Sequence, residues 1–320
     1  MKQNPEPKPL FLERMKKLLG KDMDSYLEFL KKPLTRSIRC NTLKISPEKL
    51  KERLESMGWI IEQPFEENPE IMILKNDLAP GEIGRSMEHL LGYYYVQEIS
   101  SMLSVLALKP EPGEFVLDIA AAPGSKTTQI AAVMKNTGTI IANDVSLKRL
   151  KILSSNIERC GATNTIITKK DGIALCKKLK EQGFQFDKIL VDAPCSGEGT
   201  LRSSPITYQM WNPRTIKILS RLQKALLASA IEILKPGGEI VYSTCTHAPE
   251  ENEEVVDFVL KEFGNDIGIE KINLPVKCRP GITNWSDNNY NKNIEKSCRI
   301  YPQDNDTEGF FIAKMRKIGD

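Results

Sequence analysis

Short apolar runs alternate with helix-like segments from Glu114 to the end of the chain. Apolar runs typical of buried strands lie at 114–119, 139–144, 165–169, 187–192 and 239–244. Between and after them, apolar residues recur at helical spacing and predict helices at 126–135, 146–159, 172–182, 213–234 and 249–262. Regular alternation of this kind predicts an α/β fold, a doubly wound and mostly parallel sheet with helices on both faces. The stretch 308–316 predicts one further strand, antiparallel at one side of the sheet.

The first 91 residues follow a different order and predict a smaller α/β domain. Helix-like segments at 9–17 and 23–31 precede a short strand after Pro33, a helix at 47–57, and strands at 59–61 and 71–74. From Gly92 to Leu108 the apolar period is helical, with Val96, Ile99 and Met102 on one side. We therefore expect an amino-terminal domain at 1–91, a helical join, and a main domain at 92–320.

Composition narrows the class of protein. The 320 residues are 40% hydrophobic and 27% charged, which is ordinary for a soluble globular protein, and no apolar run reaches the ~20 residues of a membrane span. No signal peptide is recognisable, so we expect a cytoplasmic protein that has no membrane contact. Seven cysteines, an odd number without paired CxxC spacing, predict free thiols in a reducing compartment and no metal site.

The net charge of +3 is small, but it is unevenly distributed. Residues 1–53 hold 14 Lys or Arg against 7 Asp or Glu, and residues 54–110 hold 3 against 9. A solvated helix face explains most such charge, and a surface that holds nucleic acid is the alternative. Arg36, Arg39 and Asn41 are open to either interpretation. The cluster Tyr93, Tyr94 and Tyr95 favours interdomain packing over a platform for base stacking.

The stretch Glu114 to Gln129, EFVLDIAAAPGSKTTQ, predicts a strand, a tight loop and a helix. Such a turn directs the free N–H groups of a helix N-terminus into the crevice at the carboxyl end of a sheet. The loop has neither GxGxxG nor GxxxxGK[ST], which argues against pyrophosphate and nucleoside triphosphates. On this stretch alone, an ordinary strand-to-helix turn is an equally good interpretation.

Acidic residues stand at the ends of four successive strands: Asp118, Asp144, Asp171 and Asp192. One acid at a strand end is a common cap, but four in register indicate a site. An acid after the second strand suits a pair of ribose hydroxyls, and one after the third can accept a hydrogen bond from an adenine amino group. A nucleoside without phosphates, such as S-adenosylmethionine, uses both.

Two cysteines lie at neighbouring strand ends, Cys195 in DAPCSGEGT and Cys245 in YSTCTHAPEEN. A thiol near a cation or a helix N-terminus shifts toward the nucleophilic thiolate, and Lys126 can supply the cation. His247 follows Cys245 by two residues on a turn, so we interpret it as a loop residue and not as a base. We expect the other five cysteines to be inert core residues, Cys40, Cys160, Cys176, Cys278 and Cys298.

Together these motifs resemble the signature blocks of the RNA cytosine-5 methyltransferases of the Nop2/Sun (NSUN, or Fmu) family. The resemblance is carried by DIAAAPGSKT, DAPCSGEGT and YSTCTHAPEENEEVV, and it extends to RCNTLK, YYVQEISSM and RIYPQDNDTEGFF. It covers nearly the whole chain from about residue 35. The family often has glycine where Ser125 stands and histidine where Gln303 stands, and the chain is similar in size to compact archaeal tRNA members.

The resemblance implies a class I, Rossmann-like, S-adenosylmethionine-dependent fold and a covalent mechanism. Cys245 adds to cytosine C6, Asp192 stabilises the addition at N3, and Cys195 assists loss of the C5 proton or product release. The target base leaves its stack, and the amino-terminal domain holds the surrounding RNA. The implied catalytic residues are Cys245, Cys195, Asp192 and Lys126. The implied cofactor-binding residues are Ala120, Ala121, Ala122, Pro123, Gly124, Ser125, Lys126, Asp144, Arg149, Asp171 and Asp192.

We therefore expect an RNA cytosine-5 methyltransferase, with tRNA favoured as substrate and a monomer as the working form. Three alternatives stay open: an rRNA cytosine-5 methyltransferase, a class I methyltransferase that acts on nitrogen without a cysteine nucleophile, and a noncatalytic RNA-binding factor. Loss of Cys245 would stop the covalent enzyme, and the two last alternatives would tolerate it.

Overall fold

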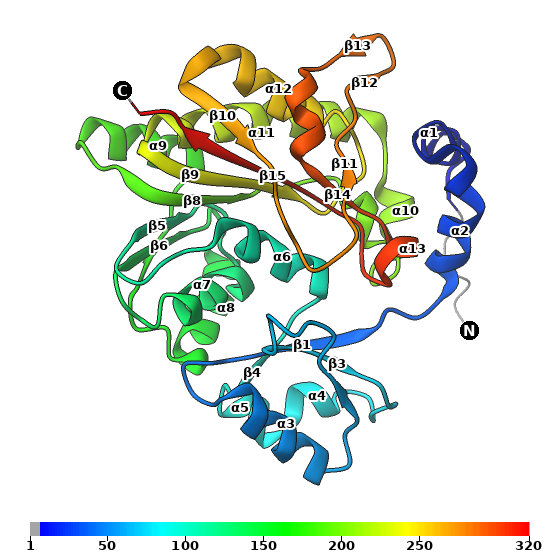
Figure 1. The fold of residues 1–320 in the computed structure, drawn as a ribbon, viewed down its shortest axis with the longest axis vertical. Helices are drawn as coiled ribbons and strands as arrows, with labels where there is room; N and C mark the ends of the chain where they lie inside the picture. Colours follow the sequence, from blue (N-terminus) through cyan, green and yellow to red (C-terminus); the bar gives the residue numbers. More distant parts are fainter. Residues whose placement is uncertain (1–6, 320) are drawn as a thin grey trace.

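The computed structural model describes residues 7–319 and contains two sheets that carry the architecture, with a small two-stranded ribbon beside them (Figure 1). Four antiparallel strands in the order β2-β3-β1-β4 form the sheet of a small unit, residues 36–96. Nine strands form the sheet of a large unit, in the order β11-β14-β15-β9-β8-β5-β6-β7, with β10 paired to β15. Among the described residues, no helix is long and apolar enough to cross a membrane.

The elements of the first hundred residues are two helices, the small unit, and the helix that enters the large unit. They are α1 (Pro9–Leu19), η1 (Gly20–Asp22), α2 (Met23–Lys31), β1 (Arg36–Cys40), α3 (Pro47–Ser56), β2 (Ile61–Glu62), β3 (Ile71–Leu74), α4 (Glu82–Arg85), α5 (Met87–Leu90), β4 (Tyr94–Val96) and α6 (Ile99–Leu108).

The large unit continues with alternating strands and helices and ends in an antiparallel region. Its elements are β5 (Phe115–Asp118), α7 (Ser125–Val133), β6 (Thr139–Asn143), α8 (Leu147–Cys160), β7 (Thr165–Thr168), α9 (Gly172–Glu181), β8 (Phe186–Asp192), η2 (Glu198–Thr200), α10 (Thr207–Met210), α11 (Pro213–Glu232), β9 (Leu234–Thr244), α12 (Glu253–Glu262), η3 (Gly264–Asp266), β10 (Ile267–Glu270), β11 (Arg279–Pro280), β12 (Asn284–Trp285), β13 (Asn288–Asn289), η4 (Lys292–Lys296), β14 (Cys298–Ile300), α13 (Pro302–Asn305) and β15 (Phe310–Lys317).

The doubly wound sheet expected from the sequence is confirmed. Strands β5 to β9 pair in parallel, and helices cover both faces of the sheet (Figure 1). One core packs α9, α11 and α12 against the sheet through residues such as Leu175, Leu226 and Val256. A second core packs α6, α7 and α8 against the opposite face. The last strand, β15, is antiparallel to β9, as expected, but β14, β11 and β10 extend the sheet beyond it and were not predicted.

The join between the two units differs from the expected continuous helix. Tyr94–Val96 is strand β4, paired with β1, and α6 begins only at Ile99. The Glu98 side chain accepts hydrogen bonds from the backbone N–H groups of Ser100 and Ser101, which caps the helix at this point. An apolar period therefore predicted the helix correctly but placed its start too early, because Val96 belongs to the strand and is exposed.

The two amino-terminal helices, α1 and α2, pack against the large unit and not against the small sheet. Phe11, Met15 and Tyr26 are buried beside Leu201 and Trp211 of the large unit, on the side of α10 and α13 (Figure 1). The division at residue 91 stays a prediction, although β4 continues the small sheet past it.

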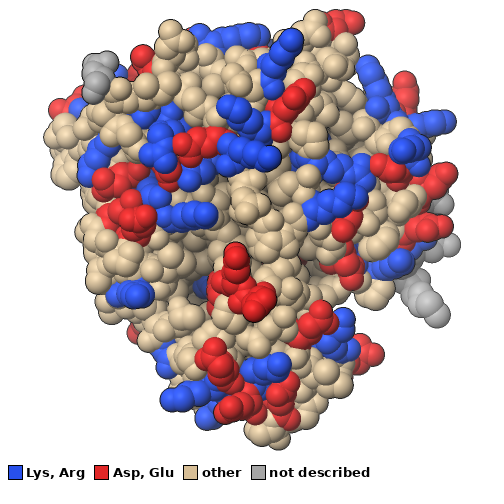
Figure 2. All heavy atoms as spheres, in the orientation of Figure 1, with Lys and Arg blue, Asp and Glu red and all other residues tan. Residues whose placement is uncertain are grey.

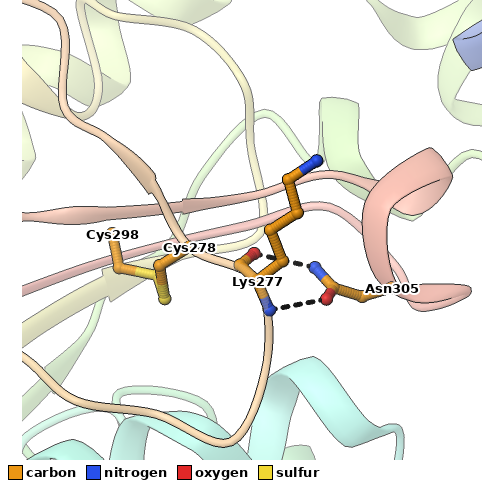
Figure 3. The surroundings of a disulfide bond; sticks show 4 residues. All are labelled: Lys277, Cys278, Cys298 and Asn305. Atoms are coloured by element: carbon orange, nitrogen blue, oxygen red, sulfur yellow. Dashed lines mark hydrogen bonds between the residues drawn. A yellow bond between two sulfur atoms is a disulfide. The ribbon is translucent and has the colours of Figure 1, made fainter.

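The sequence predicted that all seven cysteines are free thiols, and two of them are not. Cys278 and Cys298 form a disulfide, and their Cα atoms are 5.1 Å apart (Figure 3). Antiparallel pairing of β11 with β14 sets Pro280 opposite Cys298 and so brings the two thiols together. The backbone of Lys277, the residue before Cys278, donates its N–H to Asn305 Oδ1 and accepts at its carbonyl from Asn305 Nδ2, which ties the same loop to α13. The prediction that Cys278 and Cys298 are inert free thiols was therefore wrong. Within the described residues, the remaining cysteines form no disulfide: Cys40, Cys160, Cys176, Cys195 and Cys245.

Candidate active site

The loop between β5 and α7 forms the floor of the site. Gly124 begins the helix with φ at +104°, a backbone conformation that disfavours a side chain, and a Cβ there would lie 2.9 Å from the Leu153 side chain. In the first turn of the helix, the Lys126 ammonium donates to Asp192 Oδ2 at 2.8 Å and to Ser101 Oγ at 2.9 Å. The loop thus brings a buried cation to the end of β8.

Asp192 is held from two sides. Besides the bond from Lys126, its Oδ1 accepts a hydrogen bond from the Ser243 hydroxyl at 2.8 Å. Behind it lies the carboxyl of Asp118, which accepts from Thr127 and is 1% exposed. Burial, together with the nearby charge of Asp192, raises the pKa of Asp118 to about 7, although the hydrogen bond from Thr127 opposes the shift. Asp192 therefore keeps its place through fixed donors, and Asp118 supports the first turn of α7.

A cavity of about 300 Å³ opens at the carboxyl ends of the parallel strands. It is lined by Ile119, Ala120, Ala122, Asn143, Asp144, Val145, Arg149, Lys170, Asp171, Gly172, Asp192, Ala193, Pro194, Cys195, Leu222, Leu226 and Cys245. Apolar side chains from α11 and the strand ends give it walls that suit a flat ring. We refer to it as the strand-end cavity.

Asp144 offers an acceptor in this cavity. Its Oδ1 accepts from the Ser146 backbone N–H at 2.9 Å. Its Oδ2 is buried without a hydrogen bond, although the Arg149 guanidinium lies 2.9 Å away as an ion pair. One carboxylate oxygen is thus free to accept from a ligand hydroxyl.

Most of the other residues predicted for the cofactor lie here or beside it. Asp171 caps α9 by accepting from the Ala174 N–H at 3.0 Å and also lines the cavity. Ala121, Pro123 and Ser125 line a smaller adjoining cavity, which Lys126 and Asp192 share. Gly124 lines neither cavity and supports the loop by its close approach to α8.

The two thiols predicted from the strand ends meet in the structure. The Sγ atoms of Cys195 and Cys245 lie 3.2 Å apart, and neither is in a disulfide. Hydrogen bonding to Cys245 and burial raise the pKa of Cys195 well above its ordinary value. The Cys195 thiol is therefore held in its protonated form, and either sulfur can be the donor in the contact between the two thiols.

Close backbone packing fixes the Cys195 loop against the strand that bears Cys245. The Gly199 N–H donates to the Cys245 carbonyl at 2.9 Å, and the Gly309 N–H donates to the Gly199 carbonyl at the same distance. A Cβ at Gly199 would lie 2.2 Å from the Gly309 carbonyl oxygen, so only glycine fits. Glu251 adds a further tie by accepting from the Ser196 N–H at 3.0 Å.

A second cavity, of about 290 Å³, lies on the other side of Asp192 and Cys245. It is lined by Leu34, Glu98, Ser100, Ser101, Lys126, Asp192, Ala193, Thr200, Ser203, Cys245, Glu308 and Phe310. Asp192, Ala193 and Cys245 belong to both cavities. We refer to it as the thiol cavity. The two cavities thus adjoin at the Cys245 thiol.

His247 is a core residue and not a base, in agreement with the sequence interpretation. Its ring stacks on Tyr301 with centroids 5.0 Å apart and packs against Tyr26. Burial, and then the charge of Arg299, lower the pKa of His247 to about 3. The imidazole is therefore neutral and enclosed.

Neither interpretation of Arg39 and Asn41 is correct, because both side chains are buried between the units. Arg39 donates to Gln97, to the Ser125 carbonyl and to Thr128. Asn41 donates to the carbonyls of Gly92 and Cys160. Arg36 is exposed.

Interdomain packing is confirmed for Tyr95, whose ring lies between the guanidinium groups of Arg39 and Arg159. The residue is 8% exposed, so its ring is too buried for a base to stack on it.

Sequence reasoning missed several residues of the site. None of these was named as a site residue from the sequence, although all reach the site: Glu98, Ser101, Ser243, Glu308 and Phe310. Ser243 carried a usable signal, because alternation along β9 places it on the same side as Cys245, two residues on.

Two family descriptions match the chain in succession. Residues 105–316 match the 16S rRNA methyltransferase RsmB/F family, and residues 8–99 match the N-terminal domain of 16S rRNA methyltransferase RsmF.

Similar proteins of known name include an archaeal and a bacterial enzyme. A tRNA (cytosine(49)-C(5))-methyltransferase of Pyrococcus abyssi is 42% identical over 306 residues, which is 96% of this chain and 95% of that protein. A ribosomal RNA small subunit methyltransferase F of Aliivibrio salmonicida is also 42% identical, over 92% of this chain. The chain spans only 60% of the length of that bacterial relative.

Solved structures show the same fold. A methyltransferase homolog from Pyrococcus horikoshii superposes with a TM-score of 0.85 at 38% identity, covering 97% of this chain and 95% of its own. NSun6 from the same organism, solved with SFG, superposes with a TM-score of 0.84 at 28% identity, covering 98% of this chain and 99% of its own.

Proposed function

Because this chain belongs to the 16S rRNA methyltransferase RsmB/F family, the Nop2/Sun methyltransferases, we propose that it methylates C5 of a cytosine in RNA through a covalent bond to Cys245. The fold is that of the class I, Rossmann-like methyltransferases, and S-adenosylmethionine is the methyl donor. One observation supports the covalent route above all: two unpaired thiols 3.2 Å apart lie where the two cavities meet.

The strand-end cavity fits the cofactor. The free Oδ2 of Asp144 suits a ribose hydroxyl, Asp171 is available to an adenine amino group, and Ile119 and Leu226 supply apolar walls. The remaining cofactor-binding residues proposed from the sequence form the loop 120–126 and include Arg149. When bound, the cofactor supplies an electrophilic methyl group, which cytosine C5 is too weakly nucleophilic to accept without activation.

Cys245 supplies that activation. Its thiolate adds to C6 of a base held in the thiol cavity, which makes C5 enamine-like and nucleophilic. Cys195, which retains its proton, donates to the Cys245 thiolate before addition. After methyl transfer solvent water takes the C5 proton, the electron pair of the C5–H bond re-forms the C5–C6 double bond, and Cys245 Sγ departs with the electron pair of its bond to C6. Cys195 assists this last stage.

Asp192 and Lys126 act together on the base. Negative charge develops toward N3 during addition, and a hydrogen-bond donor there stabilises it. The Lys126 ammonium, 2.8 Å from Asp192 Oδ2, provides a proton that the pair can share with N3. Lys126 is thus assigned to this pair, and not to lowering the pKa of a thiol.

We propose tRNA as the substrate, because the archaeal tRNA relative is 42% identical over 96% of this chain. The equal identity to the bacterial rRNA relative keeps 16S rRNA as the second candidate. Bisulfite sequencing of tRNA and 16S rRNA, each incubated with protein and S-adenosylmethionine, tests both. If every cytosine of both RNAs is converted, neither RNA has been methylated at C5 and the proposal is wrong.

The RNA-holding surface proposed for residues 1–91 is most basic on the amino-terminal helices. Residues 36–96 carry more acidic than basic side chains, and Figure 2 shows more red than blue on the lower part of the molecule, where this unit lies. Lys31, Lys32 and Arg36 are exposed and flank Leu34, which lines the thiol cavity. We propose that they contact phosphates next to the target base. We propose that the protein works as a monomer in the cytoplasm. Light scattering, which measures the molar mass in solution, tests whether it is a monomer.

A further inference from the structure

Two carboxyl groups besides that of Asp192 line the thiol cavity, and their hydrogen bonding differs. Glu98 is saturated: its Oε1 accepts from the Glu308 N–H at 3.1 Å, and its Oε2 accepts from the N–H groups of Ser100 and Ser101. Glu98 therefore has a structural task, the capping of α6.

One carboxyl oxygen of Glu308 accepts no hydrogen bond from the described part of the chain. Its Oε1 accepts from the Ser203 N–H at 2.9 Å, but its Oε2 has no hydrogen-bond partner among the described residues. The residue is only 4% exposed, and burial raises the pKa of its carboxyl group. A buried acceptor without a donor is costly, and natural proteins usually keep one for a ligand or for catalysis.

The chemistry of the reaction requires a selector in this cavity. A thiolate adds to C6 of uracil as well as of cytosine, so covalent activation alone does not distinguish the two bases. They differ at position 4, where cytosine carries an amino donor and uracil a carbonyl acceptor. A site built to accept a hydrogen bond from a substrate rejects the analogue that lacks the donor, by a factor of about 10⁴ in strong cases.

We propose that Glu308 selects cytosine over uracil, its Oε2 accepting a hydrogen bond from the exocyclic amino group of the target base in the thiol cavity. The selection rests on the proposed function, since it requires that this cavity receive the base. The residue reaches the cavity from the segment just before β15, beside Phe310, whose ring is a second wall. With uracil in the same place, O4 would face the carboxylate, and two acceptors would repel.

The test compares two tRNA transcripts, one with 5-fluorocytidine in place of cytidine and one with 5-fluorouridine in place of uridine. A fluorine at C5 cannot leave as the proton does, so an attacked and methylated base stays joined to Cys245. With S-adenosylmethionine present, the wild-type protein is expected to trap the first transcript and not the second. Glu308→Gln, whose amide can also donate to O4, is expected to trap the cytosine analogue at least tenfold more slowly and to gain trapping of the uracil analogue.

Glu98→Gln is the matched control, because Glu98 lines the same cavity with both oxygens already occupied. Its ratio of cytosine to uracil trapping is expected to match the wild-type ratio, even if the protein is less stable. A wild-type ratio in Glu308→Gln overturns the assignment. If Glu308→Gln fails to bind S-adenosylmethionine, Glu308→Asp decides: it keeps the acceptor and must not gain activity on uracil, and a gain overturns the assignment.

Failure of the proposed mechanism gives a different pattern. If the wild-type protein traps neither transcript, the covalent route is wrong. The selectivity is then read from the ratio of 5-methylcytidine to 5-methyluridine that each protein forms in an unmodified transcript, measured by mass spectrometry. An unchanged ratio in Glu308→Gln overturns the selector in this case also.

Discussion

The Sγ atom of Cys245 lies 3.2 Å from that of Cys195, across the ends of two neighbouring parallel strands. The two residues are 50 positions apart in the chain, so the sheet and not the local sequence creates the pair. Strands β8 and β9 thus place the proposed nucleophile beside its proposed assistant, and substitutions can separate the two roles.

Cys245→Ala is expected to abolish methylation and leave S-adenosylmethionine affinity nearly unchanged, because the nucleophile is lost and the ribose and adenine contacts remain. Methyl transfer from labelled cofactor and calorimetry measure the two quantities. Normal methylation by this variant would favour the reading as a nitrogen methyltransferase.

Cys195→Ala is expected to add to the base and methylate it, and then to stall with RNA attached through Cys245. A slow-migrating band that resists denaturant reports the adduct on a gel. The double variant is the control and must lose the band, because the adduct needs the first thiol. A band in Cys245→Ala alone would reverse the two assignments.

Asp144→Ala is expected to weaken S-adenosylmethionine binding by about 1 to 3 kcal/mol, since one or two ribose hydrogen bonds are lost. Titration calorimetry measures the change. Asp266→Ala, which removes an exposed acid that lines neither cavity, is the control. Equal affinities in the two variants would remove Asp144 from the cofactor site.

RNA binding is expected to weaken steeply as salt rises, because lysine and arginine contacts to phosphate release counterions. Lys31→Ala and Lys32→Ala should each lower the slope of log affinity against log salt by about 1. Lys177→Ala is the control, since this exposed lysine lies on α9, far from α2 (Figure 1). If all three variants show the same slope of log affinity against log salt, the RNA does not contact Lys31 or Lys32.

His247 is expected to make the fold sensitive to acid. Its folded-state pKa of about 3 lies below the unfolded value of 6.5, so the unfolded chain binds the proton first as pH falls. The contribution of His247 to the free energy of unfolding is fully present above pH 6.5. It falls by about 1.4 kcal/mol for each pH unit below that value. Burial raises the pKa of Asp118 and of Glu251 to about 7, which acts in the opposite direction over part of this window.

The contribution of His247 is therefore read as a difference between proteins. Urea unfolding of the wild type and of His247→Gln, at pH 7 and at pH 5, isolates it, because the two carboxyl groups are common to both. The wild type should lose more stability than the variant between these two values. Equal losses would mean that the imidazole is accessible to protons in the folded state.

The parallel sheet and the strand ends that line the candidate site could be predicted from the sequence, because both depend on local signals. Buried strands are continuous apolar runs, and Asp144, Asp192 and Cys245 stand where those runs stop. Strands β10, β11 and β14 were missed because they are short and flank the sheet. β10 and β14 pair with β15, and β11 pairs with β14, so these strands are defined by their partners in the sheet and not by a local apolar run.

Other features required three-dimensional information. The disulfide depends on the register of two strands 20 residues apart, and nothing in the spacing of Cys278 and Cys298 announces it. Arg39 looked like a surface cation, because a charged residue is rarely buried without a counter-charge. Three acceptors from the other unit, none of them a carboxylate, make its burial possible.

Arg39 also limits relative motion within the molecule. Its guanidinium joins strand β1 of the small unit to the Ser125 carbonyl, one residue before Lys126. A hinge motion between the units would have to break this bond and disturb the first turn of α7, which carries Lys126. We therefore expect the small unit and the floor of the site to meet RNA as one preformed surface.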